Sequence, residues 1–121
     1  MTRDAVFGPS VVVGAGGVEA ELCSDRVVLV APVSRSAARR AVESLRLAPL
    51  LHGFHGRPEL PVEPVVELIH RIGMLAATTP EIRQLELNPV LVGPHGCAVV
   101  DAAISVAAPP FSVVPVRGLR A

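Results

Sequence analysis

Three oxygen-bearing side chains, Glu86, Asn88 and Asp101, stand within otherwise apolar segments of the 121-residue chain. Glu86 and Asn88 point to one face of an extended strand, because side chains alternate along a strand. A β-hairpin over residues 84–104 that turns between Pro94 and His95 places Asn88 directly opposite Asp101. Carboxylate and amide oxygens are hard ligands that suit Mg²⁺. This register predicts a site for a metal or a polar ligand, and a purely structural role for the three residues is the alternative.

The composition excludes several classes of function. Eleven basic and eleven acidic residues give a net charge of zero, so no nucleic-acid surface is expected. All the basic residues are arginines, and the chain cannot supply the lysine that phosphate-handling enzymes commonly use.

Cys23 and Cys97 have no CxxC partner, which favours small buried side chains in a reducing compartment over a disulfide. The longest apolar run, 27–33, is far shorter than the roughly 20 residues that cross a bilayer. We therefore expect a cytoplasmic protein with no membrane partner.

Hydrophobic periodicity predicts an α/β fold with a mainly antiparallel sheet and two packed helices. Besides the hairpin, alternation and β-branched residues predict strands over 10–13, 18–22 and 26–31. Helical periodicity is found over 34–47 and 62–78. Residues 1–9 are interpreted as a lead-in segment and 48–61, rich in Gly and Pro, as a loop. The expected domain covers 1–106, and 107–121 is expected to be a Pro-rich tail.

The glycine run 14–17 follows a predicted strand, where a phosphate-binding loop would lie. It lacks the GxGxxG spacing and leads into a strand rather than a helix, which argues against a dinucleotide fingerprint. A tight turn with no ligand remains open. Glu19 and Glu21 share one face of the next predicted strand, and we expect them to be solvated unless a ligand lies beside them.

Two groups of polar residues have an ordinary interpretation that we favour. His52 and His55 have an HxxH spacing, but they lie on a Gly-broken loop instead of one helical face, which disfavours a metal site. Arg39 and Arg40 are candidate phosphate ligands, yet they occupy the polar face of an amphipathic helix. Solvated charges paired with Glu43 are the expected arrangement.

Four segments, taken in order, resemble the C-terminal half of the ATP-grasp domain of NDP-forming acyl-CoA synthetases. They are FGP at 7–9, GAGGVEAE at 14–21, LRLAPLLHGFHGRP at 45–58 and PEIRQLELNPVLVGPHGCAVVDAAI at 80–104. The GGVEAE and ELNP segments are also similar, more distantly, to the GGVEIE and EINP signatures of succinyl-CoA synthetase β subunits. The resemblance runs from about residue 5 to 106.

The resemblance implies roles for six residues. Asn88 and Asp101 would hold the Mg²⁺ of ATP, and Glu86 would lie close to a phosphohistidine during phosphoryl transfer. Glu21, Gly16 and Gly17 would bind the nucleotide. The resemblance assigns no role to His52.

The family reaction converts an acid, CoA and ATP into acyl-CoA, ADP and phosphate. The N-terminal half of the ATP-grasp fold, with its phosphate-binding lysine, has no counterpart here, and the CoA-binding domain and phosphorylated histidine belong to other domains. The resemblance thus implies a nucleotide-binding part that is inactive alone and needs a second chain or domain. The alternative is a non-catalytic remnant that serves as an interaction or regulatory module, in which a partner or a second copy in a homo-oligomer covers the exposed surface.

Overall fold

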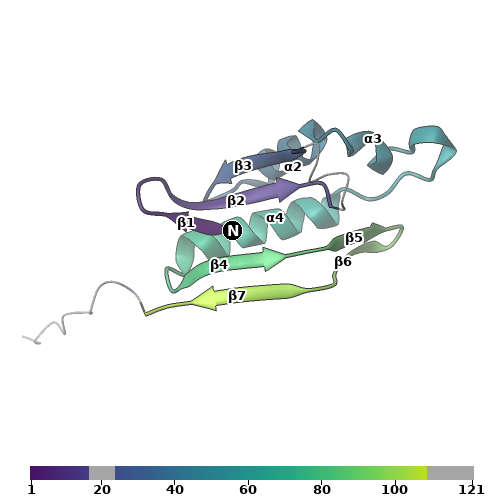
Figure 1. Ribbon diagram of the computed structural model, residues 1–121. Coiled ribbons are helices and arrows are strands. Elements are labelled where there is room, and N and C mark those ends of the chain that lie inside the picture. Colours follow the sequence, from purple (N-terminus) through teal and green to yellow (C-terminus); the bar gives the residue numbers. More distant parts are fainter. Residues whose placement is uncertain (17–23, 109–121) are drawn as a thin grey trace, which may run out of the picture.

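A five-stranded antiparallel sheet forms one layer of the protein and helices form the other (Figure 1). The computed structural model describes residues 1–16 and 24–108. The strand order is β3-β2-β1-β4-β7, and a separate two-stranded ladder pairs β5 with β6. The strands are β1 (Thr2–Asp4), β2 (Gly8–Gly14), β3 (Arg26–Val30), β4 (Ile82–Leu87), β5 (Val90–Gly93), β6 (Gly96–Val99) and β7 (Ala102–Val106). The predicted α/β class with a mainly antiparallel sheet is confirmed.

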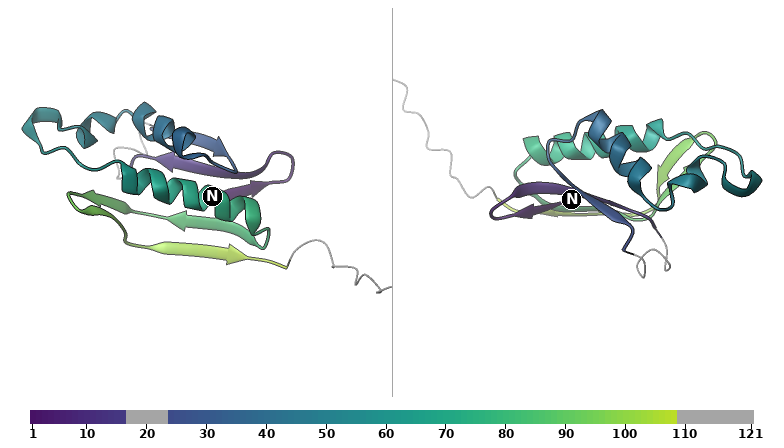
Figure 2. Two further views of the ribbon diagram at one scale, coloured as in Figure 1. Left: turned by 180° about the vertical axis from the view of Figure 1, so that it is seen from behind. Right: turned by 90° about the horizontal axis from the view of Figure 1, so that it is seen from above.

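Two amphipathic helices, α2 (Arg35–Ser44) and α4 (Glu63–Thr78), pack on the same face of the sheet (Figure 2). Ser34 caps α2, since its hydroxyl accepts a hydrogen bond from the Ala37 N–H at 3.1 Å. The apolar stripes of both helices, the inner face of β2 and residues of the connecting segments form the core: Val11, Val33, Ala38, Val42, Leu51, Val62, Val66 and Ile69. Within residues 1–16 and 24–108, the opposite face of the sheet carries no helix, and we call it the open face.

The sequence does not predict the first strand, because it favours a lead-in segment over residues 1–9. Instead β1 is the central strand, with β2 on one side and β4 on the other. The Met1 ammonium donates to the Leu85 carbonyl at 2.6 Å, and the Leu85 N–H donates to the Met1 carbonyl at 3.0 Å. The Arg3 guanidinium donates to the carbonyls of Ala76 and Thr79 at the end of α4, at 2.7 and 2.6 Å. Three residues are too few for an alternating pattern to show in the sequence. The strand is identified only by its pairing with β2 and β4 in the structure.

The connection 48–61 is more ordered than the loop predicted for it. It contains a short helix α3 (Ala48–Leu51) and a 3-10 helix η1 (Phe54–Gly56). The Leu60 N–H donates to the Leu51 carbonyl at 2.8 Å and closes the segment. Burial of Ala48 and Leu51 against the core explains why this Gly- and Pro-rich stretch is structured.

The predicted strand over 18–22, together with Cys23 and most of the expected tail, lies outside the described residues. The expected pairing of Arg39 with Glu43 is wrong, because Arg39 forms an ion pair with Glu63 of α4. Within the described ranges, no helix has the length and apolarity that a membrane crossing needs.

Candidate functional site

The hairpin has the register that its sequence predicts. Leu91 pairs with Ala98 and Gly93 with Gly96, so the turn is formed by two residues, Pro94 and His95. The same register continues in β4 and β7, where Leu87 pairs with Ala102. Asn88 and Pro89 interrupt the strand between β4 and β5, in agreement with the missing N–H of proline.

Asn88 and Asp101 lie opposite each other where the two ladders meet. The Asn88 N–H donates to the Asp101 carbonyl at 3.1 Å. The side chain of Asn88 turns to the same face as Glu86, because its Nδ2 donates to Glu86 Oε1 at 3.3 Å. All three residues are exposed. The structure therefore brings the three predicted site residues to one end of the open face.

The charge around Glu86 includes the amino terminus. Burial lowers the pKa of the Met1 ammonium, and the negative charge of Glu86 partly opposes this shift. No arginine or histidine of the described ranges forms an ion pair with Glu86 or Asp101. Apart from the hydrogen bond that Glu86 Oε1 accepts from Asn88, their carboxylate oxygens are thus available to a ligand from outside.

The donor set fits Mg²⁺ only in part. Two carboxylates and one amide oxygen are suitable hard ligands. Residues 1–16 and 24–108 contain no group of three His, Cys, Asp or Glu side chains that could hold a metal ion by itself. Mg²⁺ usually keeps several waters and binds through one or two carboxylates together with substrate phosphates. Asn88 and Asp101 are therefore suited to hold Mg²⁺ that arrives with a nucleotide, rather than a permanently bound ion.

Of the three predicted nucleotide-binding residues, Gly16 is the one that lies within the described part of the chain. Gly16 is exposed and follows β2, whereas Gly17 and Glu21 lie outside the described residues. The Ala15 N–H donates to the Asp25 carbonyl at 2.9 Å, which fixes the chain as it leaves the sheet. A side chain at Gly16 would meet nothing within 4 Å, so the space beside it is open.

A second polar cluster was not predicted. His52 Nε2 lies 2.7 Å from Glu43 Oε2, and His52 Nδ1 lies 3.9 Å from Glu59 Oε1. The hydrogen bond to Glu43 and the charge of this residue raise the pKa of His52, with a smaller contribution from Glu59. The cluster borders an open hollow of about 430 Å³ between α2 and the start of α4. No sequence spacing could have identified it, because the three residues come from separate elements.

Comparison with known proteins identifies the family. The model of the ATP-grasp domain family matches residues 1–106. The chain belongs to the ATP-grasp domain family. This confirms the resemblance to acyl-CoA synthetases of the NDP-forming class, since the relatives of this ATP-grasp chain include ADP-forming acetate–CoA ligases.

Three proteins illustrate the relationship. The chain is 39% identical to a trans-feruloyl-CoA synthase from an unknown prokaryotic organism, covering 86% of this chain and 15% of the synthase. It is 32% identical to the β subunit of acetate–CoA ligase [ADP-forming] I of Pyrococcus furiosus, covering 84% of this chain and 44% of that subunit. An acetyl-coenzyme A synthetase of Ca. Korarchaeum cryptofilum, solved in complex with coenzyme A and Mg-AMPPCP, has a TM-score of 0.82 at 37% identity. That match covers 88% of this chain and 50% of the solved one. The ATP-grasp chain thus spans half or less of each of these proteins.

Proposed function

We propose that this chain is the nucleotide- and Mg²⁺-binding part of an NDP-forming acyl-CoA synthetase, which joins an acid to CoA while ATP becomes ADP and phosphate. The observation that carries the proposal is the hairpin register, which places Asn88 opposite Asp101 beside Glu86. The Korarchaeum relative was solved with Mg-AMPPCP, a nucleotide with its metal, which supports the same ligand class here.

The residues have separate roles in this proposal. Asn88 and Asp101 hold Mg²⁺, which supplies charge neutralisation on the nucleotide phosphates when bound. Glu86 lies beside the phosphoryl group that is transferred. Gly16, Gly17 and Glu21 line the nucleotide site.

A second chain or domain completes the enzyme. It carries the other half of the ATP-grasp fold, with its phosphate-binding lysine, and the CoA-binding domain. Phosphoryl transfer depends on positioning and charge neutralisation, so the half described here binds nucleotide weakly and does not turn over alone. Residues 1–106 form the ATP-grasp part, and 107–121 are a Pro-rich tail outside it.

Calorimetric titration with Mg·ATP tests the proposal. We expect Asp101→Ala to abolish binding, because one of the two metal ligands is lost. Glu81→Ala is the matched control, since Glu81 is exposed and precedes β4, at the opposite end from Asn88. Equal affinity of Asp101→Ala and the wild-type chain would show that the metal site has been assigned to the wrong residues.

A further inference from the structure

Arg26 projects from the open face of the sheet. It is the first residue of β3, and it is exposed together with Val28 and Val30, whereas Leu29 packs against the core. Because side chains alternate along a strand, Arg26 lies on the face opposite the helices. Glu86 and Asn88 occupy this same face on β4 and just beyond it.

The strand register places Arg26 at the same end of the sheet as Asn88. Arg26 pairs with Gly14 of β2. Thr2 of β1 pairs with Ser10 of β2 on one side and with Gln84 of β4 on the other. Both β2 and β4 run antiparallel to β1, so they run in the same direction as each other. Gly14 lies four residues after Ser10, and Asn88 lies four residues after Gln84. Gly14 and Asn88 are therefore level with each other at one end of the sheet. Arg26 on one side, and Asn88 with Asp101 on the other, therefore flank the end of the sheet where residues 14–16 leave it.

Arg26 differs from four other arginines of the described ranges, Arg3, Arg35, Arg39 and Arg71, whose side chains have partners. Arg35 and Arg71 contact Glu67, and Arg39 contacts Glu63. Within residues 1–16 and 24–108, the Arg26 side chain has neither an ion pair nor a hydrogen bond. Its neighbour Gly14 has no side chain to cover it, and a Cβ built there would lie 3.4 Å from the Arg26 Cβ. The guanidinium charge is thus available on the open face.

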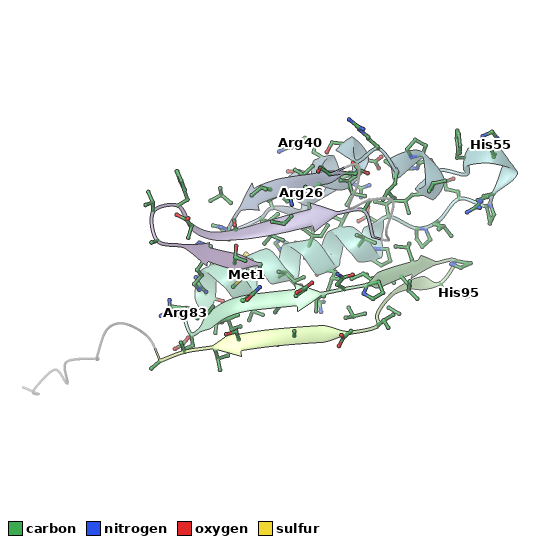
Figure 3. The ribbon with its side chains drawn as sticks, viewed as in Figure 1. Met1, Arg26, Arg40, His55, Arg83 and His95 are labelled. Atoms are coloured by element: carbon green, nitrogen blue, oxygen red, sulfur yellow. The ribbon has the colours of Figure 1, made fainter. Side chains whose placement is uncertain are left out.

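The other arginines of the described ranges that have no side-chain partner lie off the sheet or at its opposite end. Figure 3 shows Arg40 above Arg26 but on the helix layer, whereas Arg83 lies near the start of β4, away from the end where Arg26 lies. Arg46 and Arg57 belong to the connection between α2 and α4. The Arg46 N–H donates to Asp25 Oδ1 at 2.8 Å, so Arg46 lies beside the residue that precedes Arg26, but it is not part of the sheet. Among the described arginines, Arg26 is the one that the sheet presents on the same face and at the same end as Asn88.

We propose that Arg26 binds phosphate oxygens of the nucleotide whose Mg²⁺ is held by Asn88 and Asp101; this rests on the function proposed above. Three strand spacings, about 14 Å, separate the backbones of β3 and β4. The long side chain of Arg26 extends across part of this distance. The phosphate groups of the nucleotide span the rest, between the guanidinium and the Mg²⁺ held by Asn88 and Asp101. A guanidinium is a suitable partner, because its planar donors match phosphate oxygens in pairs. Arg26 would thus provide a fixed positive charge in a chain that contains no lysine.

Titration of the full chain with two probes, Mg·ATP and Mg·tripolyphosphate, tests this assignment. We expect Arg26→Gln to weaken both about tenfold, as for the loss of a hydrogen bond to a charged group. Arg26→Lys keeps the charge without the planar fork, so we expect an intermediate loss. Arg40→Gln is the matched control, because it removes the same charge from α2, and it should bind both probes like the wild type.

The outcomes separate this assignment from the proposed function. If Arg26→Gln weakens ATP but leaves tripolyphosphate unchanged, Arg26 contacts the base or ribose and the assignment is overturned. If Arg26→Gln binds both probes normally while Asp101→Ala binds neither, the assignment fails and the proposed function stands. If the wild-type chain binds neither probe, both are overturned.

Discussion

At the scale of single residues, Gly73 decides how closely α4 approaches the rest of the core. A Cβ at this position would lie 2.6 Å from the Cβ of Val33 and 2.9 Å from its backbone nitrogen. Val33 is 2% exposed, and so it has no space to move into. Glycine within a helix costs about 1 kcal/mol relative to alanine, which Gly73→Ala would recover. The overlap includes backbone atoms, so we expect the clash to outweigh this gain.

Gly73→Ala should lower the free energy of unfolding by about 2 kcal/mol, a typical cost of overpacking a core. Urea denaturation followed by circular dichroism measures it. Gly93→Ala is the control, because a Cβ at Gly93 would meet nothing within 4 Å. A variant Gly73→Ala as stable as the wild type would mean that α4 can shift away from Val33 without loss.

At the scale of elements, the sequence predicts those parts that carry a local pattern. The hairpin register followed from the glycines on either side of Pro94 and His95, and both predicted helices followed from their apolar stripes. The three residues of β1 carry no such pattern, and their place depends on two partners distant in sequence. Sheet order is likewise a tertiary property. It brings Arg26 and Asn88 to one end of the open face, and no spacing in the sequence could have predicted this.

The connection between α2 and α4 is held by a contact that responds to pH. His52 bonds to Glu43 of α2, with Glu59 nearby, while Arg39 and Glu63 form a pair across the same hollow. The pKa of His52 is raised by Glu43, so folding stabilises the protonated form. The stabilisation is fully present below the ordinary value of 6.5 and is lost as the pH rises through the raised pKa.

We therefore expect His52→Ala to lower the melting temperature at pH 5.5 and to have a smaller effect at pH 8.5. Thermal unfolding across this range measures the difference between the variant and the wild type. His95→Ala, at the exposed hairpin turn, should leave the pH dependence unchanged. A loss of stability in His52→Ala that is the same at every pH would indicate packing instead of charge.

At the scale of the whole molecule, the open face combines a polar end with an apolar patch. The patch consists of Val12, Val28 and Val30, which are 46%, 61% and 65% exposed. Val12 and Val28 are paired across β2 and β3, so the patch is continuous. In a nucleotide-binding half-domain this surface would face the complementary half, and in an interaction module it would face a partner or a second copy. Both hypotheses predict that the patch is covered in the functional state.

Association of the chain is therefore expected to depend on this patch. Light scattering should give a mass that rises above 12.6 kDa as the protein concentration increases. Val28→Thr keeps the β-branched shape but replaces one methyl group of the patch by a hydroxyl, so it should shift the chain toward the monomer. Val100→Thr is the matched control, because Val100 is 59% exposed but lies between β6 and β7, outside the patch. If the wild-type chain stays a monodisperse monomer, self-association through the open face is excluded. An added N-terminal half of the ATP-grasp fold would then be the partner to test, and its affinity should fall in Val28→Thr.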